Sequence, residues 1–388
     1  MKTTVQTINL KRMAHLAKRV AHDKSPLRDY NAKDNFTLSA AGGRVSITAT
    51  DSDIDAFMDV PANVQIDGSV HLPAADLHKA AVACGRARLA DTLITSGGAT
   101  VTVGPVALPC KLGSGDVMAP FPLDSHTETR VAFTMPELSL LAMIEAIKPA
   151  ISTEETRYYL NGFHLHPQDG QIRAVATDGH RLAYYDTRLA VSWPDGAFSG
   201  TVIVRAKFAH LIAATIKAHR LGGDAFAWIN DSRIGVRLSD GTVLAGKLIA
   251  GTYPDYDRVV PHGNKAIVDG FDFWGLGQQL KDMGATKSRI VVLDSGGSEL
   301  YETKHDGLRW NLDNVHWTGP RVAFNAGYLL DIVKSYGETA GDMKMALSTD
   351  ESPRGTFDAK TPDGHVSSPV LITAMHSPIT WVLMPLRP

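Results

Sequence analysis

A short strand-and-turn element occurs twice in this chain of 388 residues, each time between helical patterns. The two copies are residues 43–51 (GRVSITATD) and 170–178 (GQIRAVATD), which lie about 127 residues apart. A helical pattern follows each copy, at residues 73–88 and 205–220. Repeats of a solenoid are about 20 to 50 residues long, so a period of this length indicates duplicated domains instead. The chain is therefore predicted to contain tandem copies of one domain.

The last third of the chain has the same order of elements in a more divergent form. Helical patterns occupy residues 271–284 and 325–336, and strand patterns occupy residues 289–293 and 308–312. Turn-forming residues interrupt the periodicity before this copy and before the second one. A single hydrophobic core rarely grows beyond about 250 residues, which also favours several domains. The predicted domains are residues 1–123, 129–253 and 262–388.

Alternating strand patterns lie between the helical ones. The clearest are residues 44–50, 99–103, 171–177 and 233–238. A period of two with turn residues between the runs indicates antiparallel sheets. Groups of strands with helices before and within them indicate α+β domains, in which helices cover one face of each sheet.

Three helical patterns, at residues 10–22, 73–88 and 205–220, are cationic although the chain is not. Their net charges are +4, +2 and +4, whereas the formal net charge of the chain is −2. His210 and His219 are expected to add potential charge to the third pattern. The rest of the chain is therefore acidic, and such an uneven distribution fits a polyanionic partner better than the net charge alone suggests. The alternative is that these faces are simply solvated.

Composition excludes several classes of protein. No run of apolar residues approaches the roughly 18 of a membrane span, and no signal peptide follows Met1, so a cytoplasmic protein is expected. Cys84 and Cys110 are the only cysteines, too few for a disulfide scaffold or a cysteine-rich zinc site. We expect neither a cofactor nor a bound metal.

Five stretches form an ordered set of motifs along the chain. They are residues 157–162 (RYYLNG), 176–183 (ATDGHRLA), 253–261 (YPDYDRVVP), 324–331 (FNAGYLLD) and 382–387 (VLMPLR). Each is weak alone, because Asp-Gly is a common turn. Together they resemble the bacterial DNA sliding clamps, the DNA polymerase III beta subunits. The first domain matches weakly and the chain ends in Pro388, which fits a divergent or accessory member.

The resemblance implies a fold, an activity and a set of partners. It implies three tandem clamp domains per chain, with antiparallel sheets outside and helices lining the central hole of a homodimeric ring. Such a ring encircles double-stranded DNA without reading its sequence, since phosphates carry little sequence information. It is a polymerase processivity factor and not an enzyme. Its implied partners are a replicative polymerase, a clamp loader and other proteins that carry a clamp-binding peptide.

The resemblance also implies a peptide-binding cleft between the second and third domains, for a short Gln/Leu/Phe-rich peptide. Aliphatic residues and methionine would form its apolar pocket, and Arg181, Arg258 and Asn325 would fix peptide carbonyls at its rim. Ordinary core packing is the alternative for each aliphatic residue. The matching residues are Leu160, Thr177, Gly179, His180, Arg181, Leu182, Pro254, Arg258, Val259, Asn325, Tyr328, Val382, Leu383, Met384, Pro385, Leu386 and Arg387.

DNA contacts are expected from two sources. The resemblance carries over Lys24, Tyr158, Tyr159 and Lys207. The cationic helical patterns add Arg12, Lys18, Arg19, Lys79, Lys217 and Arg220.

Three other functions compete with a replicative clamp. His180 and Asp178 could serve an enzyme as an acid–base pair. His164 and His166 could hold a metal from one strand face, although no third ligand stands at a predictable spacing. A clamp-fold hub for repair or accessory functions, which does not support chromosomal replication, would have nearly the same sequence.

Overall fold

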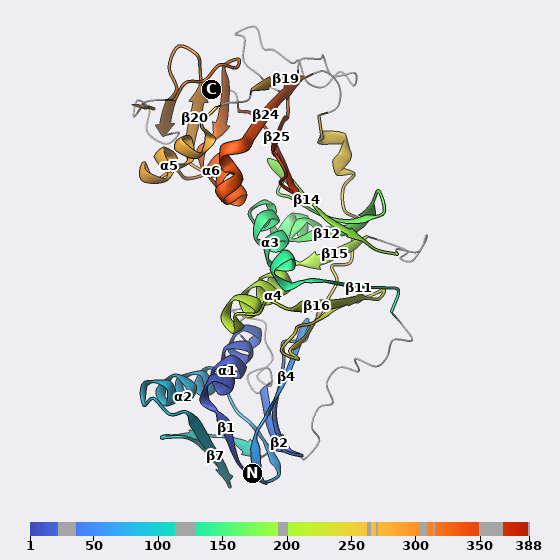
Figure 1. Ribbon diagram of the computed structural model, residues 1–388, viewed down its shortest axis with the longest axis vertical. Helices are drawn as coiled ribbons and strands as arrows, with labels where there is room; N and C mark the ends of the chain where they lie inside the picture. The colour runs from blue at the N-terminus through green and yellow to red at the C-terminus, as the bar shows by residue number, and fades with distance from the viewer. Residues whose placement is uncertain are drawn as a thin grey trace. The chain divides into compact units, whose positions relative to one another are not determined.

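The computed structural model describes residues 1–21, 36–112, 129–192, 201–261, 265–268, 271–302, 309–312, 315–348 and 368–386 (Figure 1). It divides into two compact units. The first is formed mainly by Met1–Leu141 and Lys207–Leu248, and the second mainly by Ala142–Val191 and Ile249–Pro388. This division passes through the middle of the predicted second domain, and the three predicted domain ranges stay a prediction.

Two antiparallel sheets build the first unit. One has the strand order β5 (Asn63–Ile66), β1 (Lys2–Gln6), β7 (Asp91–Gly97), β8 (Thr100–Val103) and β9 (Val106–Pro109). The other has the order β10 (Lys111–Leu112), β6 (Gly68–His71), β2 (Phe36–Ala41), β3 (Arg44–Thr50), β4 (Ile54–Pro61), β18 (Val243–Lys247), β17 (Arg233–Arg237), β16 (Asp224–Ile229) and β11 (Val131–Pro136). Since β4 pairs with β18, strands from the first two sequence repeats join in one sheet.

The helices of the first unit follow the predicted periodicity. α1 (Thr7–Ala21) and α2 (Ala74–Arg86) lie side by side (Figure 1), and α4 is Ala206–His219. Their apolar residues are buried at helical spacing: Leu10, Met13, Ala14, Leu16, Ala17 and Val20 in α1, Leu77, Ala80, Ala81 and Cys84 in α2, and Phe208, Leu211, Ile212 and Ile216 in α4.

His219 does not contribute to the surface of α4, although it was expected to add potential charge to this helix. This side chain is buried, and its Nδ1 lies 2.8 Å from Oδ2 of Asp240. The cationic surface of α4 therefore comes from Lys217 and from Arg220 directly after the helix, both of which are exposed.

The second unit also contains two antiparallel sheets. The larger has the order β15 (Val202–Arg205), β12 (Gly162–Gln168), β13 (Gln171–Thr177), β14 (Arg181–Ala190), β26 (Ile379–Leu383), β25 (Val370–Ala374), β24 (Met343–Ser348) and β19 (Lys265–Val268). The smaller has the order β22 (Arg309–Asn311), β21 (Glu299–Glu302), β20 (Arg289–Leu293) and β23 (Val322–Asn325). α5 (Phe273–Asp282) and α6 (Ala326–Tyr336) lie side by side (Figure 1).

The structure confirms the predicted α+β class with antiparallel sheets. The predicted strands at residues 44–50, 171–177 and 289–293 match β3, β13 and β20 in both bounds. In the described ranges, no helix has the length and apolar composition that crossing a membrane requires.

Candidate functional site

Three segments that are distant in the sequence meet around β14 in the second unit. The turn that leads into β14, at residues 177–181, lies next to β26 because Leu182 pairs with Val382. The chain continues from β26 with Met384, whose N–H donates to the His180 carbonyl at 3.1 Å, and Leu386, whose N–H donates to the Ala323 carbonyl at 2.8 Å. The last segment thereby bridges the β14 turn and β23. Three of the five sequence motifs share this place.

The turn before β14 is fixed by side-chain hydrogen bonds. Asp178 Oδ1 accepts the N–H groups of His180 at 3.0 Å and Arg181 at 3.1 Å. Thr177 Oγ1 accepts the Gly179 N–H at 3.1 Å and donates to the Arg181 carbonyl at 2.8 Å. Gly179 has φ of +88°, a conformation that residues with a Cβ rarely adopt. The turn therefore presents His180 from a rigid support.

The structure corrects the expected rim position of Arg181. Its side chain is only 2% exposed. Its Nε lies 3.2 Å from Asp178 Oδ2, its Nη1 lies 2.9 Å from Asp331 Oδ2, and its Nη2 donates to the Pro149 carbonyl. The guanidinium is thus satisfied inside the protein. It joins the β14 turn to α6 and has no exposed donor with which to hold a peptide.

The surface above Arg181 is aromatic. The Tyr328 ring, on α6, covers the Arg181 guanidinium at 4.3 Å and stacks with the exposed His180 ring at 6.0 Å between centroids. Lys287 Nζ lies 5.2 Å from the centre of the same tyrosine ring. Burial raises the pKa of the Tyr328 hydroxyl, and the negative charge of Asp178 adds to the rise. A neutral aromatic platform of this kind suits an apolar or aromatic anchor of a peptide.

Asn325 is also engaged within the chain, and its expected role at the rim stays a prediction. Its Oδ1 accepts the Tyr328 N–H at 3.1 Å and so caps α6, and its Nδ2 donates to the Lys287 carbonyl at 2.8 Å. Asparagine is favoured at such a cap because its side chain satisfies an N–H that the helix leaves free. Asn325 therefore positions Tyr328.

The predicted aliphatic pocket residues fall into two groups. Leu160, Leu182 and Val382 are buried in one cluster with Val175, Ile203, Ile249 and Tyr253, and Leu383 is also fully buried. These four predicted residues, Leu160, Leu182, Val382 and Leu383, therefore pack in the core of the described chain. The accessible group consists of Pro254, Val259, Met384, Pro385 and Leu386. Arg387 lies outside the described residues.

The segment that carries Pro254 and Val259 packs over the buried cluster. Tyr253 belongs to the cluster, and Tyr256 and Val260 pack against it. Val259 is 45% exposed, and Arg258 is exposed and pairs with Asp255 at 2.8 Å between Nε and Oδ2. This segment thus supplies an exposed apolar edge beside β14.

Comparison with known proteins identifies the family. A family model described as the DNA polymerase III beta subunit, central domain, matches residues 134–255. The beta sliding clamp of Caulobacter vibrioides is 30% identical over 96% of this chain and 98% of its own length. The chain belongs to the beta sliding clamp family. Membership supports a role as a processivity factor in DNA replication.

Solved clamp structures share the whole fold. The clamp of Bartonella birtlesii bound to griselimycin is 25% identical with a TM-score of 0.77, and the alignment covers 100% of both chains. The clamp of Caulobacter crescentus with bound polyethylene glycol is 27% identical with a TM-score of 0.76, covering 100% of this chain and 99% of the other. The predicted three-domain clamp fold is thereby confirmed.

The cationic residues of the clamp differ in how freely they can meet DNA. Lys18, Arg19, Lys217 and Arg220 are exposed. Lys79 is exposed and pairs with Asp76 at 3.1 Å, and Arg12 donates to the His219 carbonyl at 3.1 Å. Lys207 pairs with the Asp51 carboxylate, which is 3% exposed, so much of its charge is neutralised locally. Lys24 lies outside the described residues.

The two predicted tyrosines lie next to each other in the short helical turn Glu155–Leu160. Tyr158 is 55% exposed, whereas Tyr159 packs against the buried cluster. Their rings meet edge to face at 5.8 Å. Tyr158 is therefore the one with surface to offer a ligand.

The proposed acid–base pair of the clamp is not formed as such. Asp178 bonds to the backbone of His180 and to the Arg181 side chain, while the His180 ring faces Tyr328. His164 and His166 do share a strand face, as predicted, and their rings stack at 4.7 Å. Their nitrogens bond within the protein, His164 Nδ1 with the Val202 carbonyl at 3.2 Å and His166 Nε2 with the Tyr256 hydroxyl at 2.9 Å. In the described residues, no group of three or more potential side-chain ligands could hold a metal ion.

Sequence reasoning missed several residues of this site. Asp331, Lys287 and Pro149 complete the surroundings of Arg181 and Tyr328. Asp331 is the last residue of the motif at residues 324–331, and this position was the only indication in the sequence that it belongs to the site. Nothing in the sequence links Lys287 or Pro149 to the β14 turn.

Proposed function

We propose that this clamp acts as a homodimeric ring that encircles duplex DNA and tethers polymerases and other partners by their clamp-binding peptides. The meeting of the β14 turn, α6 and the segment after β26 carries this proposal. The exposed His180 and the half-buried Tyr328 and Met384 lie there. A ring increases polymerase processivity without catalysis, because a tethered enzyme experiences a high effective concentration of its template.

Primer extension on a nicked circular DNA tests the function. With a bacterial clamp loader and a replicative polymerase, the wild-type clamp is expected to lengthen the products severalfold at a fixed number of primers. Met384→Ala should shorten them, because Met384 is a half-buried residue of the proposed cleft and can adapt to peptide side chains. Cys110→Ser, outside the proposed cleft and in the first unit, is the matched control. The DNA must first be shown to carry the ring. If its products are then no longer than those made without clamp, the accessory hub is favoured instead.

The proposed DNA contacts rest on the exposed cations of α1 and α4 and on Lys24, Tyr158 and Tyr159. Replacement of Lys217 and Arg220 by Glu is expected to weaken binding to a short duplex. Each lost phosphate contact should reduce the slope of log K against log salt concentration by about 0.9. Arg130→Glu, at an exposed arginine next to strand β11 that pairs with Asp231, should leave the slope close to that of the wild type. A wild-type slope for the double variant would contradict the assignment of these two residues.

A further inference from the structure

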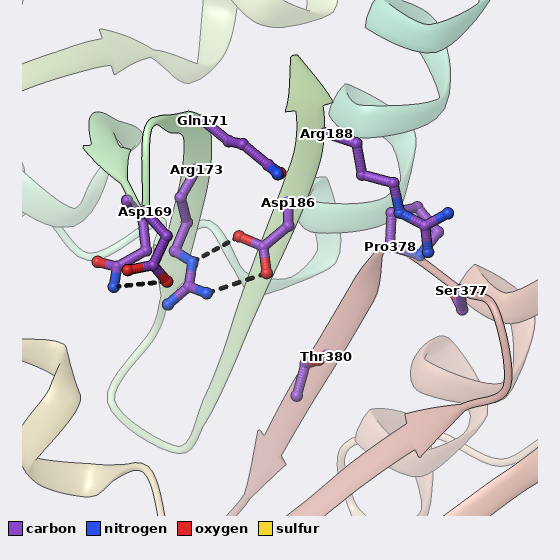
Figure 2. A pocket seen from close by; sticks show the side chains of 9 residues that line it. Asp169, Gln171, Arg173, Asp186, Arg188, Ser377, Pro378 and Thr380 are labelled. Carbon is purple, nitrogen blue, oxygen red and sulfur yellow. Dashed lines mark hydrogen bonds and ion pairs between the residues drawn. The ribbon is translucent and has the colours of Figure 1, made fainter. Parts of the chain in front are cut away.

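A polar pocket of about 420 Å³ opens in the second unit where the β12–β13 turn, β14 and the β25–β26 turn meet (Figure 2). Its lining includes Asp169 from the first turn, Gln171 from the start of β13 and Arg188 from β14. Ser377 and Thr380 line it on the side of β26. None of these residues belongs to the proposed peptide cleft or to the proposed DNA surface.

One wall of the pocket is an ion pair that is complete in itself. Arg173 and Asp186 face each other across β13 and β14 and form two contacts, Nε to Oδ1 at 2.6 Å and Nη2 to Oδ2 at 2.9 Å (Figure 2). The Arg173 guanidinium also lies 4.3 Å from the centre of the Tyr184 ring and 3.5 Å from the Tyr256 hydroxyl. A bidentate pair fixed on this many sides is a rigid surface with no net charge.

The turns around the pocket hold strained backbone. Of the six residues other than glycine with positive φ in the described chain, three border it: Asp169 at +52°, Arg188 at +55° and His376 at +60°. The pairing of β13 with β14 shifts register between Gln171 and Arg173, because residues 187–189 of β14 form a bulge opposite Ile172. Arg188 Nη2 donates to the His376 carbonyl at 3.2 Å and so ties the bulge to the β25–β26 turn. Bulges re-aim side chains near binding sites, and strain of this kind concentrates where it serves a function.

Two charges remain for a ligand, on opposite sides of the pocket. Asp169 stands at one side and the Arg188 guanidinium at the other, with the Arg173–Asp186 pair and Gln171 between them (Figure 2). Both side chains belong to exposed residues, and within the described ranges neither is joined to an oppositely charged side chain. A ligand that carries one acidic and one basic group fits this layout. β14 is an internal strand that pairs with β13 and β26, which disfavours recognition by strand addition.

The pocket lies along the same strand as the proposed cleft. Leu182, Tyr184 and Asp186 alternate along β14 and share one face of the sheet, and Leu182 belongs to the buried cluster against which Tyr256 and Val260 pack. At about 3.3 Å per residue, Asp186 lies about 13 Å from Leu182, a span of about four extended residues. Tyr256, which touches Arg173, belongs to the segment that carries Pro254 and Val259. Residues that flank a bound peptide can therefore reach the pocket.

We propose that this pocket binds charged residues flanking a partner's clamp-binding peptide, an acidic residue against Arg188 and a basic residue against Asp169. The proposal rests on the proposed function, because it extends the same partner site. Such binding would let the clamp distinguish partners whose core peptides are alike. A flank with the wrong charge would be repelled by Arg188 or by Asp169.

Fluorescence polarisation with the full-length clamp tests the pocket. The probes are a labelled Gln/Leu/Phe-rich peptide and longer versions with a Glu- and Lys-containing flank at either end. One longer version is expected to bind about three- to tenfold more tightly than the core peptide, because two exposed charge pairs contribute that much. Arg188→Asp should remove this gain, and changing the flanking Glu to Lys should restore it. Aspartate is suited to the positive φ at this position, so the fold should be retained, which thermal melting checks.

The controls separate the pocket from the cleft. Lys281→Asp reverses an exposed charge on α5 of the same unit and should preserve the gain. If the core peptide and both longer peptides bind with equal affinity, or if the gain survives Arg188→Asp, the proposed role of the pocket is wrong. The proposed cleft is unaffected by these outcomes, because the core peptide still binds. Failure of the core peptide to bind wild-type protein would overturn the proposed cleft and its extension together.

Discussion

Arg181→Ala is expected to lower the free energy of unfolding of the clamp by about 3–5 kcal/mol, the usual cost of removing one partner from a buried ion pair. The substitution leaves Asp178, whose side chain is 12% exposed, without its guanidinium, and the Pro149 carbonyl loses its donor. It also removes the support beneath the Tyr328 ring. Urea unfolding followed by circular dichroism measures the change.

Two other substitutions make this result specific. Arg258→Ala removes a similar pair, with Asp255, at a site where the arginine side chain is 69% exposed, and it should cost less than about 1 kcal/mol. Arg181→Lys keeps the charge but cannot reach three partners at once, so its loss should be intermediate. Equal losses for Arg181→Ala and Arg258→Ala would contradict the structural role of Arg181.

The difference between these arginines shows where prediction from the sequence stops. Periodicity identified the buried faces of α1, α2 and α4, because an amphipathic helix carries its orientation in its own residues. Arg181 gave no comparable signal. Its partner Asp331 lies 150 positions away in the sequence, and a charged residue in a motif ordinarily indicates a surface contact.

Asp51 and Asp178 are equivalent residues that end the two copies of the repeated element. They also show which contacts the sequence can predict and which it cannot. Each carboxylate accepts two N–H groups two and three residues further on, so the repeat encodes the same turn twice. The other oxygen of Asp51 pairs with Lys207, whereas that of Asp178 pairs with Arg181. Local turn chemistry was therefore predictable from the repeat, but the ion pairs depend on tertiary contacts.

The helical periodicity that predicted α1, α2 and α4 did not predict α3 (Glu137–Ile147). Its sequence, ELSLLAMIEAI, is apolar on nearly all sides and so lacks the stripe that marks an amphipathic helix. Glu137 at its first position is fully buried and accepts the Gly223 N–H at 2.7 Å and the Ser239 N–H at 2.7 Å. Such a buried acid is recognisable only once its donors have been brought to it.

The stability of the clamp is expected to fall as the pH drops from 6.5 towards 4, with His164 as a main cause. Burial, and to a lesser extent the neighbouring His166, lowers the pKa of His164 from 6.5 to about 4. In this interval the unfolded chain binds a proton at His164 and the folded chain does not, so the proton favours unfolding. At about 1.4 kcal/mol for each pH unit, the loss attributable to His164 approaches about 3 kcal/mol at pH 4, and it disappears as the pH rises above 6.5.

His164→Asn and His164→Phe separate this titration from packing. Asparagine can still donate to the Val202 carbonyl, whereas phenylalanine keeps the ring between His166 and Tyr253. The two variants should differ in stability at pH 7, because each loses a different contact, yet both should lose less stability than the wild type between pH 6.5 and 4. Urea unfolding at pH 7.0, 5.5 and 4.5 gives the comparison. A wild-type pH dependence in both variants would assign the acid sensitivity to other groups, since neither replacement can take up a proton in this range.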